Sequence, residues 1–117
     1  MPKINIKVSL KSPNENLKNK YIGLYQDDVL KYFEDADTKM TYYYKTNILK
    51  RETKDLIMKF YFDKEVIKIN YKELDMNMDI NIKVNRILIK DKDIEVEYTL
   101  ENPNEKEKFI YRIEVLK

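Results

Sequence analysis

Apolar side chains recur at every second position, with few breaks, between Asp55 and Val115, and the chain opens with the same pattern. These alternating runs cover residues 4–10, 56–62, 67–71, 76–84, 94–100 and 109–115. Because successive side chains of a β-strand point to opposite faces, each run predicts a strand with one apolar face and one polar face. The pattern therefore predicts an antiparallel sheet that is dry on one side.

Short segments rich in Asp, Asn, Lys and Pro separate the runs at intervals of about 8–12 residues, which is typical of sandwiches and barrels. We predict ten strands, at residues 3–11, 17–25, 29–34, 38–45, 47–52, 55–62, 65–71, 75–84, 92–100 and 107–116. Two segments, 28–33 and 47–60, also have apolar residues at helical spacing. We favour strands at both.

No segment of the chain suits a helix that could cover an open sheet, which favours a closed sheet. An open sheet of ten strands would expose two unpaired edges, which promote aggregation, and closure into a barrel removes both. We therefore predict an all-β fold: a single domain, residues 1–117, forming an antiparallel lipocalin-like (calycin-like) β-barrel of about 8–10 strands. A two-sheet sandwich is the alternative. Since Gly23 is the only glycine, we expect Asn and Asp to take the left-handed turn positions.

The composition narrows the chemistry. There is no Cys and no His, which excludes disulfides, thiolate metal sites and Ser–His or Cys–His nucleophile pairs. No phosphate loop or dinucleotide fingerprint is present. We expect a protein that is not an enzyme and has neither a metal nor another cofactor. Without a signal-peptide pattern or an apolar run of ~20 residues, we also expect a cytoplasmic protein that does not enter membranes.

Several short motifs occur in a distinctive order. They are Tyr21–Gly23, Leu30–Glu34, Thr38–Tyr44, Ile48–Arg51, Met58 with Phe60, Tyr71, Met78–Val84 and Ile94–Leu100. In this order they resemble the YwiB-like family of bacterial calycin-type barrels, whose function is uncharacterised. The resemblance implies a closed or nearly closed antiparallel barrel and supplies no activity. The chain departs from the family at Glu52, where the family tends to have Gly. It also departs in turns that usually carry Gly and here carry Lys, Asp or Asn.

Glu34 interrupts the apolar alternation, because it shares its parity with Leu30 and Tyr32. A carboxylate on the apolar face needs a partner, since an unpaired buried charge costs several kcal/mol. Arg51 is the nearest candidate, two strands away, and Arg can bind a carboxylate through two parallel hydrogen bonds. The pair is either a polar anchor for a ligand or, as we favour, a salt bridge that fixes strand register.

Tyrosine and methionine are the other candidates. Tyr42 and Tyr44 face one side of a predicted strand and Tyr43 faces the other. Two functional interpretations are a ligand cavity lined by these side chains and a base-stacking platform on the outer face near Lys39 and Lys45. The third interpretation, which we favour, is that tyrosine simply suits half-buried strands. For Met58, Met76 and Met78 we favour core packing. The candidate ligand-binding residues are Tyr32, Glu34, Tyr42, Tyr44, Arg51, Met58, Phe60, Tyr71 and Tyr98.

These observations favour a small protein that binds a partly apolar ligand in the barrel mouth. A packed barrel that serves as a structural or protein-interaction module is one alternative. Weak single-stranded nucleic-acid binding on the outer face is another, although the 23 basic and 21 acidic residues nearly balance and argue against a nucleic-acid partner. The sequence leaves the oligomeric state open, with a homodimer as one option.

Overall fold

The computed structural model describes residues 2–101 and 106–116, and within them it contains ten strands and no helix. The strands are β1 (Lys3–Lys11), β2 (Asn16–Gln26), β3 (Val29–Asp35), β4 (Thr38–Tyr43), β5 (Ile48–Glu52), β6 (Leu56–Tyr61), β7 (Val66–Tyr71), β8 (Met76–Lys90), β9 (Asp93–Glu101) and β10 (Lys106–Val115). Both segments that also fitted a helix are strands, β3 in one case and β5 with β6 in the other.

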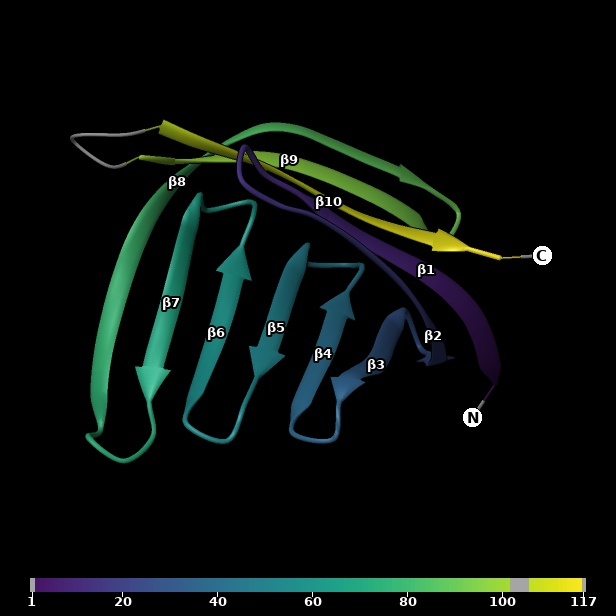
Figure 1. Cartoon of the computed structure of the whole chain (residues 1–117), viewed down its shortest axis with the longest axis horizontal. Helices are drawn as coiled ribbons and strands as arrows, with labels where there is room; N and C mark the ends of the chain where they lie inside the picture. The colour runs from purple at the N-terminus through teal and green to yellow at the C-terminus, as the bar shows by residue number, and fades with distance from the viewer. Residues whose placement is uncertain (1, 102–105, 117) are drawn as a thin grey trace. The chain divides into compact units, whose positions relative to one another are not determined.

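The hydrogen-bonded strand order is closed and runs β1-β10-β9-β8-β7-β6-β5-β4-β3-β2. The chain is therefore a ten-stranded antiparallel β-barrel, which confirms the predicted fold class. From β2 to β10 each strand pairs with the next one along the chain, and β3 to β7 lie side by side in chain order (Figure 1).

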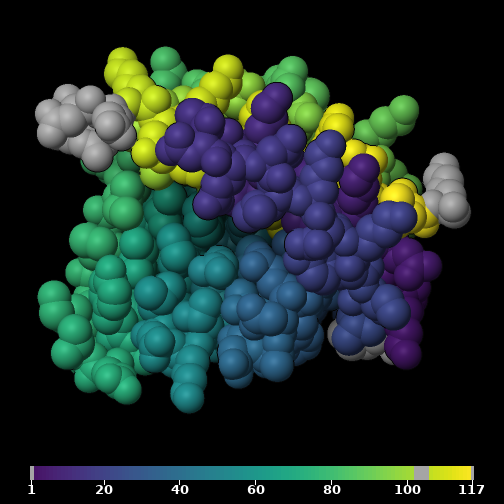
Figure 2. All heavy atoms as spheres, viewed as in Figure 1, coloured from purple at the N-terminus to yellow at the C-terminus, as the bar shows by residue number. Residues whose placement is uncertain are grey.

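The residues fall into two compact units, which are described separately. Unit 1 is Gly23–Asn81 with the first residues of the chain, and unit 2 is Ile4–Ile22 with Ile82–Lys117. Strands β1, β2 and β8 contribute to both units. The prediction of a single domain stays a prediction. The atoms of β3 to β7 form a continuous surface over unit 1, coloured blue to teal in Figure 2.

In unit 1 the two-residue alternation assigns every strand one inner and one outer face. The inner face carries the buried apolar side chains of β3 to β7, which are Leu30, Tyr32, Met40, Tyr42, Leu49, Phe60, Ile67 and Ile69. Directly paired residues share a face, and Leu30, Tyr42, Leu49, Phe60 and Ile67 form one such row across five strands. Each large apolar side chain buried in this way stabilises the fold by about 1.5–3 kcal/mol.

Unit 2 has its own apolar face and a charge-balanced outer face. Its buried side chains are Ile6, Val8, Ile82, Ile94, Val96, Tyr98, Tyr111 and Ile113. On the outer face, Glu95 lies 2.6 Å from Arg86 Nη2 and 3.3 Å from Arg112 Nε, and Glu97 lies 3.4 Å from Lys108 Nζ. Neighbouring strands here carry opposite charges, which is the arrangement that stabilises a sheet surface.

The structure corrects the predicted end of one strand. The sequence predicts that the strand beginning near residue 75 ends at Val84, whereas β8 continues to Lys90. The pairing with β9 shifts register between Val84 and Arg86, so Asn85 is an extra residue in the ladder. A bulge moves the alternation by one position, so the inner residues change from even to odd numbers. A prediction that requires apolar residues at every second position therefore ends the strand at the bulge.

The turns confirm the role predicted for Asp and Asn. Among the described non-glycine residues, positive φ occurs at Asp27, Asp28, Asn47, Glu65, Asp75 and Asp91, and Gly23 has no positive φ. Asp and Asn tolerate this region better than other non-glycine residues do. Asp27 and Asp28 form the two-residue connection between β2 and β3, where positive φ at both positions matches the twist of a hairpin.

Candidate functional site

The candidate site lies at the end of unit 1 that carries the β3–β4, β5–β6 and β7–β8 turns, at the bottom of Figure 1. Local hydrogen bonds fix two of these turns. Asp35 Oδ1 accepts a hydrogen bond from the Asp37 N–H at 2.9 Å. The Thr53 N–H donates to the Leu56 carbonyl at 2.9 Å, and the Leu56 N–H donates to Thr53 Oγ1 at 3.2 Å. The residues that flank these turns are therefore held in defined positions.

Glu34 and Arg51 are paired in the structure, as the sequence predicts. Arg51 Nη2 lies 3.8 Å from Glu34 Oε2, and the two side chains are 38% and 33% exposed. The register of β3 against β4 shifts between Phe33 and Asp35, so Glu34 sits at a β-bulge. Bulges redirect side chains beside functional sites. At 3.8 Å the contact is too long for a good hydrogen bond, so N–H donors of the guanidinium stay available to a ligand.

Methionines continue the inner face beside Arg51. Arg51 pairs with Met58, Met58 with Ile69, and Ile69 with Met78, so Met58 and Met78 share the face of Arg51. Inner-face residues are normally buried, but Met78 is 44% exposed and Met76, which pairs with Tyr71, is 56% exposed. We call Glu34, Arg51, Met58, Tyr71, Met76 and Met78 the mouth cluster. It combines an adaptable apolar surface with one ion pair.

Asp35 adds a second carboxylate near Arg51. The pKa of Asp35 is lowered, chiefly by the backbone hydrogen bond from Asp37, then by the side chain of Thr38 and, as a smaller effect, by the charge of Arg51. Across the turn, Lys72 Nζ donates to the Thr53 carbonyl at 2.9 Å and lies 3.7 Å from Glu52. The charged groups at this end are thus held by several partners.

The other predicted site residues do not belong to the mouth cluster, although Tyr32 stands in the same cross-strand row as Arg51, through Met40. Tyr32, Phe60 and Tyr98 are buried in the core, at 1%, 8% and 7% exposure, and Tyr98 belongs to unit 2. Burial raises the pKa of Tyr98. Tyr42 and Tyr44 are nearest the opposite set of turns, so the structure does not bring them to the mouth cluster.

Tyr42 and Tyr44 belong to a packed aromatic group. Their rings meet edge to face at 5.2 Å, and Tyr25 meets Tyr44 in the same way at 5.6 Å. The Tyr42 hydroxyl donates to Asn47 Oδ1 at 3.2 Å, and Asn47 Nδ2 donates to Asp63 Oδ1 at 3.4 Å. Burial, and then the nearby charge of Asp63, raise the pKa of Tyr42. This group orders the turn that contains Asn47.

The sequence predicts Met76 and Met78 in the core, whereas both are exposed. Both occupy the first inner-face positions after the β7–β8 turn, and this is the available signal, because side chains at the end of a strand have neighbours on fewer sides. Leu74, in the adjoining turn, is also 67% exposed.

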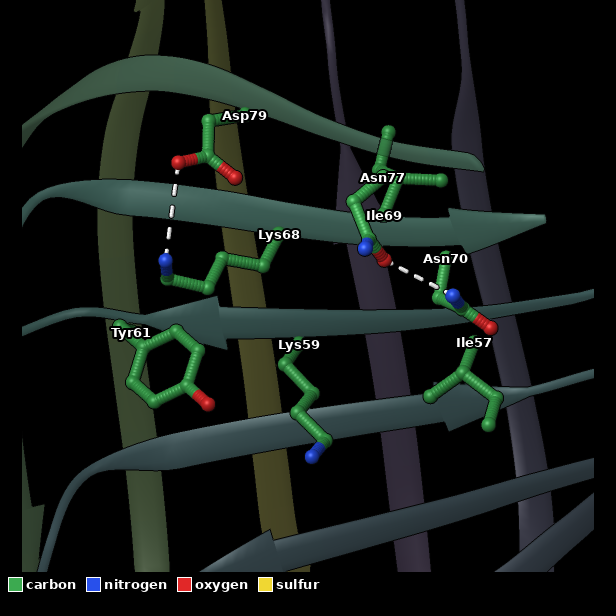
Figure 3. Close-up of a pocket in the computed structure, with 8 residues that line it drawn as sticks. All are labelled: Ile57, Lys59, Tyr61, Lys68, Ile69, Asn70, Asn77 and Asp79. Carbon is green, nitrogen blue, oxygen red and sulfur yellow. Dashed lines mark hydrogen bonds and ion pairs between the residues drawn. The ribbon is translucent and has the colours of Figure 1, made fainter. Parts of the chain in front are cut away.

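The outer face of unit 1 contains a second feature, a shallow hollow of about 600 Å³ over β6, β7 and β8. Figure 3 shows Lys59 beside Tyr61, Lys68 joined to Asp79, and Asn70 joined to Asn77. An adjacent hollow of about 200 Å³ is lined by Tyr43, Thr46, Ile48, Lys50, Lys59 and Tyr61. Lysine and tyrosine side chains therefore line both hollows.

No family model, curated protein or solved structure matches this chain. The resemblance to the YwiB-like family stays a prediction. Within residues 2–101 and 106–116, no group of three or more acidic side chains is placed to hold a metal ion. The same part of the chain has no helix with the length and apolar character needed to cross a membrane.

Proposed function

We propose that this protein is a non-enzymatic binder of a small, partly apolar ligand, which it holds at the mouth cluster. The observation that carries the proposal is the exposure of Met76 and Met78, at 56% and 44%, on a face that elsewhere buries its side chains. Exposed methionines on an inner face offer a flexible apolar surface that adapts to a ligand.

The ion pair supplies the polar part of the proposed site. Ligand sites are mostly apolar with a few convergent polar groups that set orientation. Arg51 pairs directly with Met58, and Arg51 and Glu34 are partly exposed and 3.8 Å apart. In the proposed complex, the apolar part of the ligand packs on the methionines, and its head group contacts the guanidinium or the carboxylate.

Fluorescence titration with 8-anilinonaphthalene-1-sulfonate, an apolar anion, tests this site. We expect enhanced fluorescence with the native protein and at least about fivefold weaker binding for Arg51→Gln and for Met78→Gln, since each removes one part of the site. Arg86→Gln is the matched control, because Arg86 is an exposed arginine of unit 2. Native mass spectrometry of the purified protein should also show a bound molecule that Met78→Gln loses.

Equal binding of the dye to the native protein, Arg51→Gln and Met78→Gln would overturn the proposal. The mouth cluster would then serve folding alone, in agreement with the alternative of a packed interaction module. Urea unfolding of each variant shows whether a change in dye binding comes from loss of the folded state.

A further inference from the structure

Strand register brings three lysines into one row on the outer face of unit 1. Lys50 of β5 pairs directly with Lys59 of β6, and Lys59 pairs directly with Lys68 of β7. We call these residues the lysine row. With neighbouring strands about 4.7–4.9 Å apart, the first and last lysines lie roughly 10 Å apart. Like charges directly opposite one another destabilise a sheet, so the arrangement is unfavourable for folding alone.

Carboxylates neutralise this row only in part. Lys50 Nζ lies 3.7 Å from Glu52, and Lys68 Nζ lies 3.5 Å from Asp79. Among the described residues, no carboxylate lies within 4.0 Å of Lys59 Nζ, and Figure 3 draws no dashed line to Lys59. The outer face of unit 2 is different, because Glu95 and Glu97 there pair with arginine or lysine on adjoining strands. The lysine row is thus a local excess of positive charge.

A row of flat and apolar side chains runs parallel to the lysines. Tyr43 of β4 pairs with Ile48 of β5, and Ile48 pairs with Tyr61 of β6. We call these residues the tyrosine row. Tyr61 and Ile48 are each two positions from a lysine of the row, which puts the two rows about 7 Å apart on the same face. Lys64 Nζ lies 5.5 Å from the centre of the Tyr61 ring and adds a further positive charge.

We propose that this face binds single-stranded nucleic acid across β4 to β7, with phosphates on the lysine row and bases against the tyrosine row. Proteins that bind single strands without sequence preference combine a basic track with aromatic side chains on which bases stack. Residues of both rows line the hollow of about 200 Å³, and Lys59, Tyr61 and Lys68 also line the adjacent hollow of about 600 Å³, so the two rows border one hollowed face. This function is independent of the ligand site at the mouth cluster.

Other anionic partners fit the face less well. An acidic peptide that adds a strand needs a free sheet edge, but β4 to β7 are each paired on both sides. A membrane surface favours exposed apolar anchors beside the basic residues. The outer-face residues of β4 to β7 are absent from the exposed large hydrophobic side chains of the described chain. Phosphate combined with a flat base matches both rows.

Fluorescence anisotropy with a labelled 15-nucleotide oligothymidylate tests the proposal. We expect binding at ~50 mM salt that weakens steeply at ~200 mM salt. Replacing all three lysines of the row by Gln should weaken binding at least about tenfold and lower the salt slope by about 2, since each phosphate contact on a single strand contributes ~0.7. Tyr43→Leu with Tyr61→Leu should weaken binding roughly tenfold while leaving the slope unchanged.

Two controls separate binding from folding and from net charge. Lys18, Lys83 and Lys90 are exposed residues of unit 2, and replacing all three by Gln removes the same total charge but should preserve binding within about twofold. Lys59→Gln should weaken binding while leaving the melting temperature unchanged or raised, because it relieves like-charge repulsion. A binding defect caused by unfolding would lower that temperature.

Three outcomes would overturn the proposal. The first is the absence of oligonucleotide binding at ~50 mM salt, where phosphate contacts are strongest. The second is equal weakening by the unit 2 control, which would show attraction by net charge alone. The third is tighter binding of polyglutamate or anionic vesicles than of the oligonucleotide, with no effect of the tyrosine substitutions, which would assign the face to an acidic protein or a membrane surface.

Discussion

Tyr42→Phe tests how much the hydroxyl of Tyr42 contributes to the free energy of unfolding, and how that contribution changes with pH. Tyr42 is fully buried, and its hydroxyl donates to Asn47 Oδ1 at 3.2 Å. Phenylalanine keeps the ring and removes this hydrogen bond. Since a typical hydrogen bond contributes about 0.5–1.5 kcal/mol, we expect the variant to be about 1 kcal/mol less stable near pH 7.

The same substitution should have the opposite effect in alkali. Burial raises the pKa of Tyr42 above its value of about 10 in the unfolded chain. A raised folded-state pKa means that the stabilising contribution is complete below pH ~10 and is lost as the pH rises above it. At pH 11 the unfolded phenol is mostly ionised while the folded one stays neutral, which removes about 1.4 kcal/mol from the native protein.

Phenylalanine has no such loss, so the variant should be about 0.4 kcal/mol more stable than the native protein at pH 11, by the difference of these two effects. Urea unfolding at pH 7 and pH 11, followed by circular dichroism, measures this reversal. Ile94→Val is the matched control: Ile94 is 2% exposed, and the change costs about 0.5–1.5 kcal/mol at either pH. A deficit of Tyr42→Phe that is equal at both pH values would refute the reasoning.

Three further predictions concern stability. A double-mutant cycle of Glu34→Gln and Arg51→Gln should give a coupling of about 0.2–1 kcal/mol that falls in ~0.5 M salt, because the pair is partly exposed; a coupling above ~2 kcal/mol would contradict this. Phe62→Ala should lower the free energy of unfolding by about 3–5 kcal/mol, because Phe62 is 1% exposed, and a loss below ~1 kcal/mol in urea would disagree. Glu65→Gly should raise the melting temperature, since Glu65 has φ 55° and glycine avoids the left-handed penalty; a lower temperature would count against that account.

Most of the fold follows from local pattern, since alternation, turn chemistry and the cost of open edges together predict ten strands in a closed barrel. The end of β8 does not follow. Asn85 carries no distinctive bulge signal, yet it shifts every later inner residue by one position. A count of every second residue assumes that the same parity, odd or even, faces inward along the whole strand. In β8 the pairing with β9 determines that parity. Boundaries at bulges are therefore decided by pairing rather than by the strand's own sequence.

The candidate site was predictable only where alternation exposes an anomaly. Glu34 stands out because it is a carboxylate at an apolar position. Arg51 shares the parity of Leu49, which predicts it as the partner, and its Nη2 lies 3.8 Å from Glu34 Oε2. Tyr42 and Phe60 share that apolar parity but are buried. Parity reports which face a side chain takes. It does not report where along the strand the core ends, and that position determines how exposed an inner-face side chain is.

The lysine row shows what only the register reveals. Lys50, Lys59 and Lys68 are nine residues apart along the chain, and each looks like an ordinary outer-face residue of its own strand. In a β-hairpin the numbers of two paired residues add up to the same value along the whole hairpin. The lengths of the turns between β5, β6 and β7 therefore determine whether a lysine pairs with another lysine or with a glutamate. A shift of two residues along either neighbour would keep every apolar side chain inside and still break the row. Apolar burial therefore does not require this alignment, which is why we look to an anionic partner for its explanation.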